Sequence, residues 1–386
     1  MRILILAPRV PWPLLDGGRI AMARLAESLA RLADTRILSL NPKKHRVESS
    51  DAVDIDTSRI AGPLLRALTS DAPFLVTRFH SRAFAIRLVE TLRSFQPDVV
   101  QIESPFLLPY ADVIRKESRA FLALRSLNVE FRIWEELART QRAVAKRLIA
   151  RSLRDYEVRH LDTCDALIPI SGDDANDFRA LGCTRPIHVA PCGVPLPPRT
   201  DEESEPGSVG FIGALDYQPN QQAVQWIFDE LWPRVLARAP HARLTVSGSN
   251  PPAWLRDRVI TAPDAQAFMR SQSVLIAPLL SGGGMRIKVL ESMALGKAMV
   301  ATTRGAGGIE FTPGRELLVA DDPDTFADAV ARLLDDPRER ARLGAAARAQ
   351  VAAKYDPDRI GEALLAFYRT GISDSTTRAN HHHARP

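Results

Sequence analysis

Cysteine is scarce in this chain, and long uninterrupted hydrophobic runs are missing. The 386 residues include three cysteines, Cys164, Cys183 and Cys192. Their odd number argues against a disulfide framework, and their spacing does not match that of metal ligands. We therefore expect the chain to fold in the reducing cytoplasm. No run approaches the ~18–20 apolar residues of a membrane-spanning helix, and residues 1–8 lack the length and cleavage pattern of a signal peptide.

Several motifs are also absent, and each absence argues against a class of chemistry. The sequence has no Walker loop, nucleophile elbow or zinc-ligand spacing. Gly207, Gly210 and Gly213 are spaced by three, and residues 305–308 are rich in glycine, but neither group forms Gly-x-Gly-x-x-Gly after a strand. Hydride transfer with a bound dinucleotide is therefore disfavoured.

What is present is the composition of a globular protein, with 45% hydrophobic and 25% charged residues in a length that favours two domains. Strand-like apolar runs alternate with helical periodicity in two series, and a proline-rich, acidic linker at residues 191–208 separates them. The first series predicts strands at 2–6, 36–40, 98–102, 121–124 and 166–170 and helices at 18–33 and 84–94. The second predicts strands at 209–212, 243–247, 259–261, 274–278, 298–302 and 317–319 and helices at 221–237, 265–271, 324–334, 337–352 and 357–370.

This alternation predicts an α/β fold with two doubly wound parallel sheets. We expect one domain at residues 1–193 and a second at 194–370, whose last helix is able to pack back on the first domain. The polar residues 371–386 are expected to form a disordered tail.

The positive charge, a net +5, is concentrated in residues 139–159. Seven arginines and lysines there face two acidic residues, and apolar residues recur at helical spacing. The segment predicts a basic amphipathic helix. Two interpretations stay open: an ordinary solvated face, or peripheral contact with an anionic membrane.

The most informative segment is Ser281-Gly-Gly-Gly-Met-Arg-Ile-Lys-Val-Leu-Glu-Ser-Met-Ala-Leu-Gly296, which follows an apolar run. Gly282, Gly283 and Gly284 allow a ligand to approach the backbone, and a helix that starts beyond them directs amides towards anions. Arg286, Lys288 and Glu291 add two cations and a carboxylate. This combination suits a ligand with phosphates and sugar hydroxyls, such as a nucleotide-sugar.

Together with other segments, this stretch resembles the family 4 retaining glycosyltransferases of GT-B fold, also called glycosyltransferase group 1, such as the sugar transferases of exopolysaccharide and lipopolysaccharide synthesis. The matching segments, in chain order, are residues 13–18, 128–130, 164–171, 191–194, 211–220, 282–296 and 298–302. The resemblance implies two Rossmann-like domains that face each other across a cleft. The first would bind the acceptor and the second the nucleotide-sugar.

The resemblance also implies roles for single residues. Arg286 and Lys288 are candidate catalytic cations that neutralise the departing diphosphate, and Glu130, at the end of Asn128-Val-Glu130, is the third catalytic candidate. Glu291 would accept hydrogen bonds from the ribose. The other candidate donor-binding residues are Gly17, Gly18, Asp216, Tyr217, Gly282, Gly283, Gly284, Met285 and Ile287.

Structural alternatives remain for these assignments. Gly17 and Gly18 also suit a tight turn, and Lys288 and Glu291 also suit a helix ion pair. Asn128 and Glu130 also suit a structural role. Glu103, directly after a strand, is a further candidate for the cleft.

The chain departs from the family pattern at two positions. Gly283 stands where the first glutamate of Glu-x7-Glu is expected, and Leu127 stands where a histidine often precedes Asn-Val-Glu. Asp54-Ile-Asp56 matches the metal motif of the other large glycosyltransferase fold without its context, so no metal and no cofactor are expected.

We therefore expect a retaining, metal-independent transferase that moves a sugar to a glycan or lipid-linked acceptor, in the cytoplasm or at the inner face of the membrane. A nucleotide-sugar epimerase or hydrolase and a non-catalytic nucleotide-sugar binder are the alternatives. Nucleic acid is not an expected partner.

Overall fold

The computed structural model describes residues 1–49, 51–140, 143–199 and 204–383. It divides into two compact units. The first contains Met1–Gly193 and helix α15 (Pro357–His383), and the second contains Val194–Asp356.

The first unit is built on a parallel sheet of six strands in the order β3-β2-β1-β4-β5-β6. The strands are β1 (Arg2–Ala7), β2 (Asp34–Pro42), β3 (Ala52–Ile55), β4 (Val99–Ile102), β5 (Phe121–Ser126) and β6 (Ala166–Pro169). The helices are α1 (Gly17–Leu32), α2 (Ala61–Thr69), α3 (Phe74–Thr77), α4 (Arg82–Phe95), α5 (Ala111–Glu117), α6 (Glu130–Thr140), α7 (Val144–Arg159) and α8 (Gly172–Ala180).

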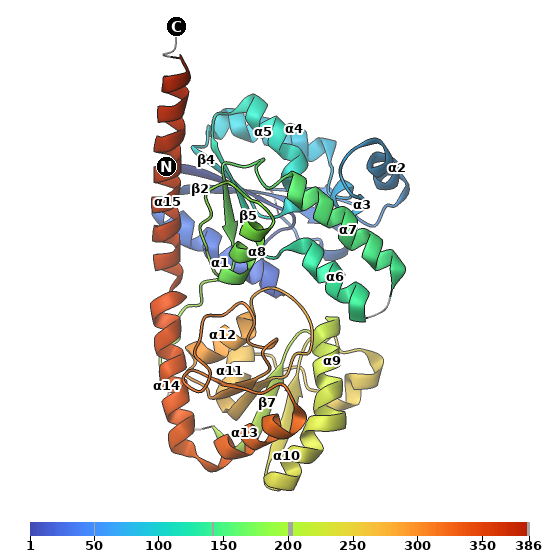
Figure 1. Cartoon of the computed structure of the whole chain (residues 1–386), viewed down its shortest axis with the longest axis vertical. Helices are drawn as coiled ribbons and strands as arrows, with labels where there is room; N and C mark the ends of the chain where they lie inside the picture. Colours follow the sequence, from blue (N-terminus) through green and yellow to red (C-terminus); the bar gives the residue numbers. More distant parts are fainter. Residues whose placement is uncertain (50, 141–142, 200–203, 384–386) are drawn as a thin grey trace. The chain divides into compact units, whose positions relative to one another are not determined.

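Helices cover both faces of this sheet, because its strands are apolar on both sides. Leu4 and Leu6 of β1 pack in one cluster with α4, while Ile3 and Ile5 pack in another with α1 and α15. This is the two-residue alternation of a strand that is buried on both faces. Figure 1 shows α1 and α15 side by side on this unit.

The second unit has a parallel sheet of five strands in the order β11-β10-β9-β7-β8. Its strands are β7 (Glu205–Ile212), β8 (Arg243–Ser247), β9 (Gln272–Ala277), β10 (Met299–Ala301) and β11 (Leu318–Val319). Its helices are α9 (Gln218–Trp226), the π-turn η3 (Ile227–Leu231), α10 (Trp232–Arg238), α11 (Ala265–Ser271), α12 (Ile287–Ala294), α13 (Pro323–Asp335) and α14 (Pro337–Lys354).

The prediction of two doubly wound parallel sheets is confirmed, but several elements differ from the expected pattern. Residues 259–261 do not form a strand; Ile260 makes an isolated bridge to Ser247. The helix expected at 221–237 begins at Gln218 and contains a π-turn. Pro233 follows this turn, and its missing N–H accounts for the break in the regular ladder.

The C-terminal helix packs back on the first unit, which was the possibility left open for the last helix of the chain. Leu364, Leu365 and Tyr368 of α15 pack against the first unit's sheet, so this helix belongs to that unit and not to the second. The helix also continues to His383, where a disordered tail was predicted from the polar composition. Ile372 extends its contact with the apolar cluster, and no proline interrupts the segment.

The basic segment is two helices rather than one. Arg139 lies near the end of α6, α7 begins at Val144, and Arg142 lies outside the described residues. Within the part of the chain that the structure describes, no helix is both long and apolar enough to cross a bilayer.

Candidate functional site

Ligands of doubly wound sheets bind beyond the carboxyl ends of the strands. Each unit has one such edge, and the predicted site residues fall at both. In the second unit they lie after β7 and β9; in the first they lie after β1 and β5.

The glycine loop after β9 has a backbone that requires glycine. Gly282 and Gly284 have φ of +103° and +74°, in the left-handed region. Met285 packs against the apolar cluster below and the Ile287 side chain is buried, so a ligand would meet their backbones. Ile287 begins α12, as the sequence predicted for the helix after the loop.

Arg286 stabilises this loop through three hydrogen bonds to backbone carbonyl groups. Its guanidinium donates to the carbonyl oxygens of Gly282 at 2.6 Å, Gly283 at 2.7 Å and Arg304 at 3.1 Å. The side chain thereby shapes the loop and places a positive charge inside it, because a guanidinium stays protonated.

Lys288 and Glu291 lie on one face of α12. The Lys288 Nζ is 2.8 Å from Glu291 Oε2, so the helix ion pair that the spacing allowed is present. The lysine side chain is 40% exposed and the glutamate side chain 9%. A phosphate or a ribose therefore meets the lysine more readily than the carboxylate in this arrangement.

A second glycine-rich loop, residues 302–308, packs against the first. Thr302 Oγ1 donates to Leu279 O at 2.5 Å and accepts from the Gly305 N–H at 2.8 Å. A Cβ added to Gly308 would lie 3.0 Å from the Cα of Met285. The two loops therefore form one tightly packed wall at the edge of the sheet.

The residues after β7 reach the same edge. A Cβ on Gly282 would lie 3.1 Å from the Tyr217 hydroxyl, so the structure brings these two predicted residues together. Asp216 instead accepts from Asn250 Nδ2 at 3.3 Å. Asn220 lies inside α9 and donates to Ala214 O at 2.8 Å.

In the first unit, Gly17 and Gly18 are the first residues of α1, whose N-cap is Asp16. Asp16 accepts from the Arg19 N–H at 3.1 Å and from the Arg9 guanidinium at 2.7 Å. A Cβ on Gly18 would lie 2.5 Å from Arg9 Nη2, so this glycine lets Arg9 lie over the start of the helix. Arg9, two residues beyond the end of β1, was not predicted from the sequence.

Glu130 starts α6 within a cluster of carboxyl groups. Glu157 accepts from the backbone N–H groups of Glu130 and Phe131, at 3.1 and 2.8 Å. Asp174 accepts from the Ser171 hydroxyl at 2.6 Å. Glu157 and Asp174 were missed because they lie 27 and 44 positions beyond Glu130, with no motif of their own.

Burial raises the pKa of each of these carboxyl groups. The pKa of Glu130 rises to about 7, against the lowering effects of an Asn128 hydrogen bond and the Arg9 charge. Burial raises the pKa of Glu157 to about 8 and that of Asp174 to about 6, and neighbouring carboxylates add to both shifts. The Glu130 carboxyl is therefore able to hold or release a proton near neutral pH.

Internal contacts occupy the other acidic residues considered from the sequence. Glu103 directly follows β4, but its side chain is buried and pairs with Arg125 at 2.8 Å inside the first unit, so it is not exposed to a ligand. Asp54 accepts from Asn41 Nδ2 at 2.9 Å and Asp56 from the Ser58 N–H at 3.1 Å. Local bonds thus account for the Asp-x-Asp pair.

The carboxyl cluster predicts how stability depends on pH. Each group binds its proton more tightly in the folded chain than in the unfolded chain, so stability is greatest when the groups are protonated and falls as pH rises from about 5 to about 8. One pKa unit corresponds to about 1.4 kcal/mol, and we expect the free energy of unfolding to fall by about 2 kcal/mol or more. Urea denaturation at each pH measures it.

The matched variant for this measurement is Glu157→Gln. The absolute stability of this variant will change. Both carboxylate oxygens of Glu157 accept a backbone N–H, and glutamine replaces one of these oxygens with an NH₂ group, which donates. The readout is therefore the slope with pH, which should flatten; an unchanged slope would assign the dependence to other groups.

Comparison with known families agrees with this geometry. Residues 206–336 match the family model described as "Glycosyl transferases group 1", and residues 15–196 match that described as "Glycosyltransferase Family 4". The chain belongs to the group 1, family 4 glycosyltransferases, and it is a glycosyltransferase.

Individual relatives cover most of the chain. An uncharacterized 44.6 kDa protein in the cps region of Klebsiella pneumoniae is 23% identical over 353 residues, 84% of this chain and 89% of that protein. Sucrose-phosphate synthase from Thermosynechococcus elongatus aligns with a TM-score of 0.73 at 16% identity, over 97% of this chain and 100% of the other. HepE of Anabaena in complex with UDP-glucose aligns with a TM-score of 0.62 at 13% identity, over 96% and 100%. These structures show that the fold is GT-B.

Proposed function

We propose that this glycosyltransferase moves a sugar from a nucleotide diphosphate-sugar to a hydroxyl group of a glycan or lipid-linked acceptor in cell-surface polysaccharide synthesis, with retention of configuration and without a metal ion. The second unit binds the donor and the first binds the acceptor. The observation that carries the proposal is the Lys288–Glu291 pair beside two packed glycine loops. The complex of HepE with UDP-glucose supports the donor class, and the cps-region relative supports the polysaccharide.

The second unit's edge suits a departing nucleotide diphosphate. Negative charge grows on the diphosphate as its bond to the sugar breaks, and a fixed cation stabilises that charge in the transition state. Lys288 supplies this cation, and the loop that Arg286 holds adds a second positive charge. These charges stabilise the leaving diphosphate in place of the divalent ion that other transferases use. Glu291 accepts hydrogen bonds from the ribose hydroxyls.

Retention follows from attack on the same face of the sugar that the diphosphate leaves. The acceptor oxygen forms its bond to the anomeric carbon as the bond to the phosphate oxygen breaks, and the acceptor proton passes to that oxygen. Glu130 orients the acceptor hydroxyl through a hydrogen bond. The protein makes peripheral contact with an anionic membrane, where a lipid-linked acceptor resides.

Calorimetry and product analysis test the proposal. UDP or GDP should bind in buffer with EDTA, and a nucleotide at 100 times its Kd should stabilise the folded chain by about 2.7 kcal/mol. The matching nucleotide-sugar should be consumed only when a lipid extract supplies an acceptor. Glu291→Ala should weaken binding about tenfold or more.

The control is Lys354→Ala, which removes the exposed ion pair with Glu310 in the same unit and should leave binding unchanged. Binding of neither nucleotide would contradict the proposal. Consumption of the donor without acceptor would favour a hydrolase or epimerase, and loss of activity in EDTA would overturn metal independence.

A further inference from the structure

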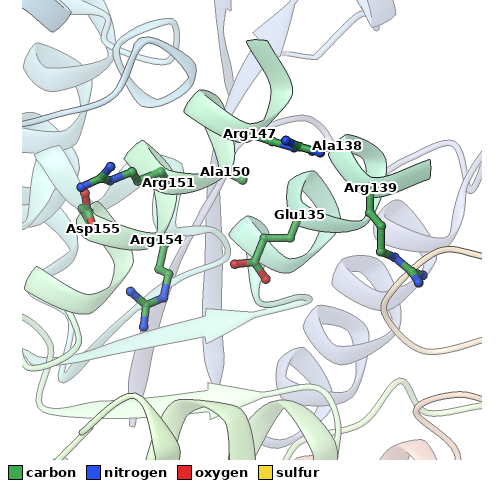
Figure 2. A pocket seen from close by; sticks show the side chains of 8 residues that line it. All are labelled: Glu135, Ala138, Arg139, Arg147, Ala150, Arg151, Arg154 and Asp155. Atoms are coloured by element: carbon green, nitrogen blue, oxygen red, sulfur yellow. The ribbon is translucent and has the colours of Figure 1, made fainter. Parts of the chain in front are cut away.

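An open groove lies between α6 and α7 in the first unit. It has a volume of about 890 Å³ and is lined by Arg139 of α6 and Arg147, Arg151 and Arg154 of α7. Figure 2 shows Arg154 reaching from one helix and Glu135 from the other into the space between them. The catalytic proposals above use none of these side chains.

The arginines form a row of like charge along one face of α7. Positions 147, 151 and 154 are spaced by four and three residues, so these arginines follow one another about one helical turn apart on the helix. Such a row is unfavourable by itself. Four arginines face two acidic residues in the groove, and one of these, Glu135, already pairs with Arg132 at 3.4 Å. Among the described residues, none of the four arginines makes an ion pair.

This row suits an anion with more than one charged oxygen. Guanidinium groups bind phosphate oxygens with paired, directed hydrogen bonds, so several of them around one groove favour a phosphate or diphosphate ester. Apolar side chains lie on the next row of the same helix: Val144 and Leu148 are 68% and 65% exposed. A ligand with a charged phosphate and an apolar chain matches both rows.

The groove also lies at a suitable separation from Glu130. Glu130 and Ala138 are on the same helix, eight residues apart, which corresponds to roughly 12 Å along its axis. We propose that this groove binds the phosphate or diphosphate group through which a sugar acceptor is joined to its lipid. The assignment rests on the proposed function, and it places a short glycan between the phosphate and the reacting hydroxyl.

Binding of geranyl diphosphate tests the assignment. It is measured by calorimetry at low salt with UDP present, because UDP occupies the diphosphate site of the second unit. Arg147→Gln with Arg151→Gln should weaken binding at least tenfold, and 0.5 M salt should weaken binding to the natural chain as well. Geraniol should not bind.

The control is Arg82→Gln with Arg87→Gln on α4, a pair of exposed arginines of the same unit away from the groove. Unchanged melting temperatures in both double variants exclude misfolding as the cause. Equal affinities of the groove variant and the natural chain for geranyl diphosphate would overturn the assignment.

A second arm separates the acceptor's phosphate from membrane headgroups. Vesicles of phosphatidylcholine with phosphatidylglycerol are sedimented with each variant. A groove variant that loses vesicle binding but keeps geranyl diphosphate binding would show that the groove binds anionic lipid headgroups. That result overturns the assignment. UDP affinity is measured separately, so a chain that binds geranyl diphosphate but no nucleotide would contradict the proposed function and leave the groove's ligand established.

Discussion

Lys288→Ala should lower kcat for sugar transfer by about 100-fold or more. Removing one fixed charge or donor that faces a developing anion costs about 3 kcal/mol of transition-state stabilisation in enzymes where it has been measured. Lys288 is the exposed member of its ion pair, so it is the cation that a diphosphate meets. The measurement is steady-state kinetics with saturating acceptor, and the donor KM should change much less than kcat.

Two further variants separate catalysis from folding. Lys288→Arg keeps the charge and should retain more activity than the alanine variant. Lys288→Ala also leaves the mostly buried Glu291 without this cation, so the melting temperature must be followed in parallel. A kcat within twofold of the natural chain would show that the departing diphosphate does not meet Lys288.

Gly305→Ala should destabilise the second unit by about 3 kcal/mol. A Cβ at this position would overlap the carbonyl oxygen of Ala277, the last residue of β9, and would lie 3.1 Å from Thr302 Oγ1. Both neighbours are held in place by the sheet and by hydrogen bonds, so the overlap must move the backbone. Chemical denaturation measures the loss, and nucleotide affinity should fall with it because the two glycine loops share this wall.

The matched control is Gly307→Ala in the same loop. Its added Cβ would meet one atom, the carbonyl oxygen of Arg304, at 3.3 Å, which a small adjustment relieves. If Gly305→Ala and Gly307→Ala cost the same free energy, the close approach to β9 does not limit the loop.

The sequence predicted most of the sheet because buried parallel strands are continuous apolar runs. β5 is buried along its whole length, and its pattern is clear without the structure. β3 was missed because it is a short edge strand with partly exposed residues. The sequence left open whether α15 covers the first or the second sheet, because an apolar helical face does not specify the sheet that it packs against.

The part of the candidate site that lies within one sequence motif was predictable. The glycines and the Lys288–Glu291 spacing lie within ten residues, so local periodicity places them together. The direction of a long side chain is set by its surroundings instead: Arg286 binds carbonyl groups of its own loop and of Arg304. Glu157 and Arg9 escaped notice for the related reason that folding, not sequence proximity, brings them to Glu130.

The position of α15 has a consequence for how the chain is made. The first unit needs Leu364 and Tyr368 to cover Ile3 and Leu25, yet the ribosome adds this helix after the whole second unit. The part of this apolar face that α1 does not cover therefore stays exposed during most of synthesis, and a fragment that ends at Gly193 would keep it exposed. The second unit, by contrast, is one continuous stretch that is able to complete its core before translation ends.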